Sequence, residues 1–119
     1  MPVTFIGHIG FNDTSEIHGP TYSRILDKDH VEAAARAQEE GGFDRALIPL
    51  GSDTPESQIV ATHAAAITTR LGFLIAHRPG FTQPTVAARQ LATLDQLSGG
   101  RVAVHIIQLL LIRETEVHP

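Results

Sequence analysis

The sequence has no cysteine, no tryptophan, no excess of basic residues and no long apolar run. Without cysteine it cannot be a disulfide scaffold, and a hydrophobic fraction of 42% is too high for a disordered tail. Nine Lys and Arg against thirteen Asp and Glu give a formal net charge of -4, which argues against binding to nucleic acid or an anionic membrane. A single tyrosine, Tyr22, argues against stacking on nucleobases.

Several targeting and catalytic signals are also missing. The longest apolar run, residues 106–112, is far below the roughly 18 residues that span a bilayer. The N-terminus lacks the basic stretch and apolar core of a secretory signal, so we expect a soluble cytoplasmic protein. No GxGxxG, Walker A, GxSxG or HExxH pattern occurs, and the histidines never fall at ligand spacing, so no metal is expected.

Strand-like and helix-like segments alternate along one domain, residues 1–119. Short β-branched or apolar runs predict strands, and segments rich in helix formers predict helices between them. This order indicates an α/β fold with a parallel sheet built by right-handed crossovers. The predicted strands are residues 3–8, 46–50, 71–76 and 102–107, the helices end near 40, 69 and 98, and residues 9–26 form a long loop.

Capping residues predict where the three helices begin and end. Asp27 or Asp29 is expected to cap the first helix, and Pro84 to open the third. Glycine pairs at 41–42 and 99–100 predict left-handed stops. Apolar spacing predicts which residues face the core, namely Ile59, Val60, His63, Ala64 and Ile67 in the second helix and Ala87, Leu91, Leu94 and Leu97 in the third.

Polar side chains follow the strand ends, where parallel α/β folds bind ligands. His8 ends the first strand, and it either lines a pocket or caps the barrel mouth. Arg78, after His77, suits a phosphate, sulfonate or carboxylate, although spacing alone favours an ion pair with an acid on a neighbouring loop.

Three further residues have a structural role to weigh beside a functional one. Thr54 precedes Pro55, so its hydroxyl is expected to cap the second helix, with a ligand contact as the alternative. His63 is expected to be a hydrogen-bonded core histidine. His105 alternates with apolar neighbours and is expected to face the barrel interior, as a weaker site candidate.

Three segments together resemble a known family. Residues 42–49 (GFDRALIP), 78–80 (RPG) and above all 84–101 (PTVAARQLATLDQLSGGR) are similar to the bacterial-luciferase-like flavin-dependent monooxygenases, most of all to the alkanesulfonate monooxygenase branch. The resemblance extends over roughly residues 27–107. It implies a (β/α)8 TIM barrel that binds reduced FMN from a separate flavin reductase, uses dioxygen, and releases sulfite from small organosulfur substrates.

The resemblance also implies where the flavin lies. In this family it sits over the carboxyl ends of the strands, and the corresponding residues here are His8, Leu50, Thr54, Ala76, His77, Arg78 and His105. Sulfonate members commonly carry a cysteine where this sequence has Thr54, which keeps a hydroxyl but loses the thiol. The resemblance gives no catalytic residue.

The family pattern stops at Ile107, and residues 108–119 form an atypical tail. A complete barrel needs about 250 residues, so we expect the N-terminal half of a barrel, with four strands and three helices, inactive alone and with its continuation lost or replaced. One alternative is a non-catalytic half-barrel stabilised as a homo-oligomer, since two copies supply eight strands. Another is a relative that uses a deazaflavin.

Overall fold

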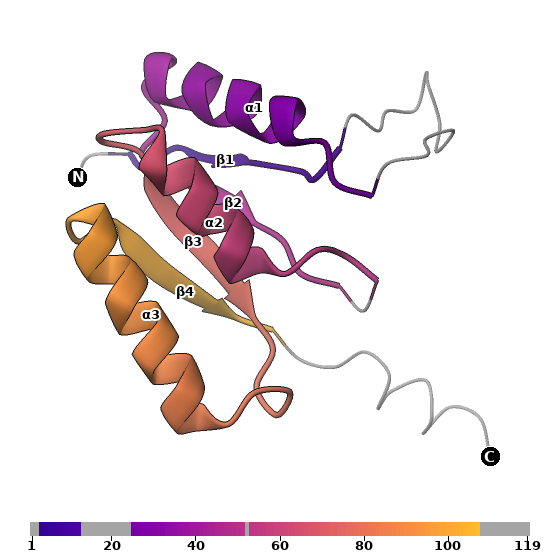
Figure 1. The fold of residues 1–119 in the computed structure, drawn as a ribbon. Helices are drawn as coiled ribbons and strands as arrows, with labels where there is room; N and C mark the ends of the chain where they lie inside the picture. The colour runs from indigo at the N-terminus through magenta and orange to yellow at the C-terminus, as the bar shows by residue number, and fades with distance from the viewer. Residues whose placement is uncertain (1–2, 13–24, 52, 108–119) are drawn as a thin grey trace.

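The computed structural model describes residues 3–12, 25–51 and 53–107. In these residues four parallel strands form one sheet in the order β1-β2-β3-β4. The three helices lie on the same face of this sheet (Figure 1). The predicted α/β fold with parallel strands is therefore confirmed. Its elements are β1 (Ile6–His8), α1 (Lys28–Glu40), β2 (Arg45–Ile48), α2 (Ser57–Ala66), β3 (Gly72–His77), α3 (Pro84–Ser98) and β4 (Val102–Ile106).

The sheet has a covered face, which lies under the helices, and an open face on its other side. Ala46 and Ile48 are fully buried, whereas Leu47 between them is only half-buried, because successive side chains of a strand point to opposite faces. The register pairs Ala46 with Phe73 and Leu47 with Leu74, so the alternation continues across the sheet. The open face carries Ile6, His8, Arg45, Leu47, Leu74, Ala76, Ala103 and His105.

The core lies between the covered face and the helices. Phe73 and Ile75 supply its sheet side, and both are fully buried. Alanines of α2 face them, and their small side chains let the helix approach the sheet closely. Val31 and Ala35 fix α1 over the same core.

Helix α2 begins later than the sequence predicts. Its N-cap is Glu56, whose carboxylate accepts a hydrogen bond of 2.8 Å from the Ile59 N–H. The predicted cap, Thr54, is wrong, because its hydroxyl accepts a hydrogen bond from the Gly51 N–H within the preceding loop. The carboxylate of Glu56, two residues further on, therefore caps the helix instead. The other predicted caps are correct, since Asp27 caps α1 and Gly99 ends α3 in the left-handed region.

Two aliphatic residues that were predicted to face the core are instead on the surface. Ile59 is 71% exposed and Leu97 is 74% exposed. The buried apolar side chains of α2 are Val60, Ala61, Ala64 and Ala65, which form a stripe displaced by about one residue from the predicted one. Each helix rests on the sheet along a narrow stripe, so apolar residues at the stripe's edge stay in solvent.

The described start of the loop after β1 packs against the sheet. The Ile9 N–H donates to the Leu47 carbonyl at 3.0 Å, which continues the pairing of β1 with β2, and Ile9 and Phe11 are buried. The rest of the predicted loop at residues 13–24, and the atypical tail at 108–119, lie outside the described residues. Among the helices of the described residues, none has the length and apolar character that crossing a membrane requires.

Candidate functional site

The carboxyl edge of the sheet gathers most of the predicted site residues. His8 ends β1, Ala76 and His77 end β3, and His105 lies one residue before the end of β4. Because the strands are parallel and in register, these ends form one edge of the sheet.

On the open face, this edge combines two histidines with an apolar floor. The register places Ala76 of β3 directly beside His105 of β4, and His8 of β1 beside Leu47 of β2. Leu74 and Ala103 form the neighbouring row, and the side chains of His8 and His105 are exposed. The result is a floor of small and aliphatic side chains with an imidazole on each outer strand. Such a surface suits a flat, largely apolar ring system with polar edges.

The other predicted residues lie on the covered side. Leu50, His77 and Arg78 line a groove between α2 and α3, with a volume of about 860 Å³. The Arg78 guanidinium lies over the ring of Phe81, 5.4 Å from its centroid. Ala76 and His77 are adjacent in β3, so their side chains point to opposite faces. The residues predicted as one site therefore divide between two faces. Alternation within β3 separates Ala76 from His77, but the register is needed to place the residues of the other strands.

Thr54 lies on the loop between β2 and α2. Its hydroxyl accepts from the Gly51 N–H at 2.8 Å and is 3.2 Å from the Gly51 carbonyl, to which it donates. The hydrogen-bonding capacity of this side chain is thus used within its own loop. A contact between Thr54 and a cofactor stays a prediction.

Two residues that support the site were not found from the sequence. Gln38 of α1 donates from Nε2 to the carbonyl of His8 at 2.8 Å, and buried Ser57 of α2 donates to the carbonyl of Ala76, also at 2.8 Å. A Cβ at Gly7 would lie 2.1 Å from Oε1 of Gln38, so a larger residue there would have to displace the Gln38 side chain. Both bonds hold strand ends in place. They join residues far apart in the sequence, and no local pattern marks them.

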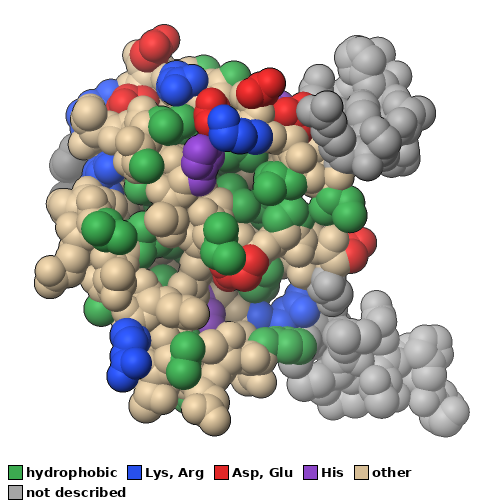
Figure 2. Space-filling model, in the orientation of Figure 1, with side chains coloured by type: hydrophobic (Ala, Val, Ile, Leu, Met, Phe, Trp, Pro, Cys, Tyr) green, Lys and Arg blue, Asp and Glu red, His purple; other side chains and the backbone are tan. Residues whose placement is uncertain are grey.

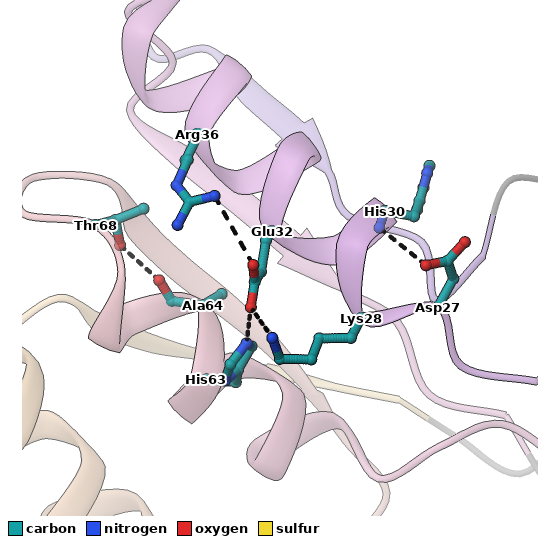
Figure 3. A network of polar contacts seen from close by, with 8 residues as sticks. All are labelled: Asp27, Lys28, His30, Glu32, Arg36, His63, Ala64 and Thr68. Atoms are coloured by element: carbon teal, nitrogen blue, oxygen red, sulfur yellow. Dashed lines mark hydrogen bonds and ion pairs between the residues drawn. The ribbon is translucent and has the colours of Figure 1, made fainter.

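His63 belongs to a polar network that joins α1 to α2 (Figure 3). Its Nε2 is 2.6 Å from Oε2 of Glu32, and the same carboxylate meets Lys28 at 3.0 Å and Arg36 at 3.8 Å. Hydrogen bonds from Lys28 and then from His63 hold the pKa of Glu32 below its ordinary value. His63 is hydrogen-bonded as expected, but its side chain is 41% exposed, so its predicted place in the core is wrong.

Comparison with known proteins identifies the fold in which this edge occurs. Residues 8–108 match the family described as luciferase-like monooxygenase. Among solved structures, the chain is similar to the EDTA monooxygenase EmoA from Chelativorans sp. BNC1, with a TM-score of 0.77 and 19% identity over 89% of this chain and 28% of that one.

Two further solved structures share this fold. The coenzyme F420-dependent tetrahydromethanopterin reductase from Methanopyrus kandleri gives a TM-score of 0.72 and 23% identity over 89% of this chain and 27% of that one. DmoA from Hyphomicrobium sulfonivorans gives a TM-score of 0.69 and 20% identity, over 89% of this chain and 28% of that one. The chain thus spans less than a third of the length of these relatives.

Proposed function

Because the chain belongs to the luciferase-like monooxygenase family, we propose that it supplies the first strands of a barrel whose open face binds reduced FMN. The observation that carries this proposal is the apolar floor between His8 and His105 at the carboxyl edge of the sheet. In other α/β barrels, ligands are bound at this same end of the strands.

The residues of the open face fit the ring of a flavin. Leu74, Ala76 and Ala103 offer an apolar floor without bulky groups, and the imidazoles of His8 and His105 can donate or accept hydrogen bonds at its edges. Reduced flavin, when bound, would supply electrons to dioxygen, which is reduced as the substrate is oxidised. The role of the protein here is to hold the ring over the strand ends.

The substrate and the donor of reduced flavin form the finer part of the proposal. The segments 78–80 and 84–101 support an alkanesulfonate or a similar small organosulfur compound as substrate, with a separate flavin reductase as partner. An F420-dependent enzyme among the structural relatives supports a deazaflavin as the alternative cofactor. Sulfite release from short alkanesulfonates, assayed with reduced FMN, tests the substrate class.

A second candidate is a half-barrel that is stabilised by pairing with another copy. The outer strands of the described sheet leave apolar side chains in solvent, namely Phe5 just before β1, Ile6 in β1, and Val104 and Ile106 in β4. Edge strands with apolar side chains favour pairing with a further strand. Two such sheets contain the eight strands of a barrel. Sedimentation across a range of protein concentrations tests this candidate, and a monomer at all concentrations would contradict it.

Titration with oxidised and reduced FMN, followed by flavin fluorescence, tests the main proposal. We expect saturable binding that His8→Ala and His105→Ala each weaken about fivefold, the effect of one hydrogen bond. His30→Ala in α1 is the matched control and should leave the affinity unchanged, because His30 is not on the open face. Absence of saturable binding of either flavin, or equal weakening in all three variants, would contradict the proposal.

A further inference from the structure

The pairing of β3 with β2 ends before β3 itself ends. The last residues paired between these strands are Ile48 and Ile75, whereas β3 continues to His77. The residue after β2 is Pro49, which has no N–H to extend the ladder. The final two residues of β3, Ala76 and His77, therefore have strand partners in β4 only.

The carbonyl of Ala76 points toward β2 rather than toward β4. In a parallel sheet, successive residues of a strand direct their backbone groups alternately to the two neighbouring strands. In β3 the Gly72 N–H donates to the Asp44 carbonyl beside β2 at 3.0 Å, and the His77 carbonyl accepts from the Ile107 N–H beside β4 at 3.0 Å. Ala76 shares the direction of Gly72, so its carbonyl lies where β2 supplies no further donor.

Ser57, the first residue of α2, supplies a donor for this carbonyl. Its Oγ donates to the Ala76 carbonyl at 2.8 Å, and Ser57 is only 1% exposed. The hydroxyl points inward to the sheet, away from the outer surface of the helices that Figure 2 shows. A carbonyl that is buried without a partner lowers stability, so this bond fixes the end of β3 to the start of α2.

The bond acts on a peptide group that joins the two faces of the sheet. Ala76 places its side chain on the open face beside His105, and the next residue, His77, points to the covered side. Rotation of the Ala76 carbonyl would turn this peptide group and shift both side chains. Ser57 therefore acts on the open face from the covered side of the sheet, through the backbone of β3.

We propose that Ser57 is a positioning residue of the flavin site, whose hydroxyl holds the Ala76 carbonyl and thereby keeps Ala76 beside His105. This role rests on the proposed binding of flavin at the open face. Ser57 makes no contact with the ring, because the sheet lies between them. Its loss should weaken flavin binding by disturbing the floor, while the imidazoles of the open face stay in the chain.

Titration of the full chain with FMN, followed by flavin fluorescence, tests the effect on binding. Ser57→Ala should weaken FMN about fivefold. Thr68→Ala is the matched control, because Thr68 is also a buried hydroxyl and donates to the Ala64 carbonyl at 2.8 Å, at the other end of α2. Both variants should lower Tm, but Thr68→Ala should bind FMN as the unmodified chain does. Ser57→Cys keeps a weak donor of similar size, so its affinity should lie between those of the unmodified chain and Ser57→Ala.

NMR of the chain without flavin separates this proposal from flavin binding itself. We expect the carbonyl carbon of Ala76 and the amide of His105 to shift in Ser57→Ala and not in Thr68→Ala. If the unmodified chain binds neither oxidised nor reduced FMN, the proposed function fails, while these two shifts still support the positioning role of Ser57. An unweakened affinity in Ser57→Ala, an equal weakening in Thr68→Ala, or an unchanged His105 amide in Ser57→Ala would overturn that role.

Discussion

The two ends of the sheet differ in how their polar groups are used. At the amino end, Glu39 and Arg101 are bonded to several backbone groups at once, whereas at the carboxyl end the histidines of the open face are exposed and a groove lies between the helices. In α/β barrels the amino end chiefly serves stability and the carboxyl end binds ligands. The difference indicates which substitutions should unfold this protein and which should change its binding.

Arg101, just before β4, ties three elements together at the amino end. Its guanidinium donates to the carbonyls of Ala65 at 2.9 Å, Thr68 at 3.2 Å and Leu71 at 3.0 Å, and its Nε donates to the Ser98 carbonyl at 2.6 Å. These carbonyls lie at the ends of α2 and α3 and at the residue before β3. One side chain therefore hydrogen-bonds the free carbonyls at the ends of two helices and the carbonyl just before a strand.

Arg101→Ala should have the largest effect of the variants considered. It removes the donors of several part-buried carbonyls at once, so we expect a loss of about 3 kcal/mol in the free energy of unfolding. Urea denaturation measures this loss. Arg36→Ala, which removes an exposed arginine whose Nη1 is 3.8 Å from Glu32, is the control and should change little. Equal effects of the two variants would remove the contrast between the two ends of the sheet.

Glu39→Gln should have the next largest effect. Its carboxylate accepts the N–H groups of Thr69, Arg70 and Leu71 at distances of 2.6–3.2 Å. Burial raises the pKa of this carboxyl, but these backbone hydrogen bonds outweigh burial, so the pKa lies below its ordinary value of 4.5. We expect a loss of about 1.5 kcal/mol near neutral pH, measured by urea denaturation.

The lowered pKa of Glu39 also fixes the pH dependence of that loss. A carboxyl whose pKa is lower in the folded state stabilises the protein above pH 4.5 and loses this contribution as the pH falls through the folded value. The difference in the free energy of unfolding between the unmodified chain and Glu39→Gln should therefore reach its full value above pH 4.5 and become smaller below it. A difference that grows toward acid pH would contradict the assignment.

Glu56→Ala tests the cap of α2 at the carboxyl end of the sheet. Loss of an N-cap side chain costs about 1 kcal/mol, and thermal unfolding should show it. Thr54→Ala is the comparison, because the hydroxyl of Thr54 bonds within the loop rather than to the helix. If Thr54→Ala destabilised α2 more than Glu56→Ala, the cap would be Thr54 after all.

Glu32→Gln should have the smallest effect. Its contacts with Lys28, Arg36 and His63 join α1 to α2 at the surface, where solvent and salt screen them. We expect a fall in Tm smaller than that of Glu56→Ala, and one that disappears in high salt. A salt-independent fall as large as that of Arg101→Ala would show that the stability of the protein does not reside mainly at the amino end.

Periodic features of the sequence predicted the fold well. Alternating apolar strands and alanine-rich helices indicated four parallel strands with three helices, and glycines 99–100 marked the end of α3. It was harder to predict which side chains of a helix face the core and which residues distant in the sequence are in contact. Ile59 and Leu97 fitted a helical stripe but lie beside it, since a helix on a flat sheet buries only a narrow line of residues.

The candidate site was predicted in its parts rather than in its arrangement. Strand ends pointed to His8, His77 and His105, but only the register shows that His77 faces the helices while the other two lie on the open face. Gln38 and Ser57 escaped prediction because each bonds a backbone carbonyl distant in the sequence. Such bonds depend on tertiary structure, which no local pattern encodes.

The most direct test of flavin binding at the carboxyl end is a map of backbone amide NMR shifts as FMN is added to the isotope-labelled chain. We predict that the largest shifts occur at His8, Ala76 and His105 on the open face, while Glu39 and Arg101 at the amino end stay unchanged. Shifts concentrated at the amino end, or none on the open face at saturating flavin, would contradict the assignment of binding to the carboxyl end of the sheet.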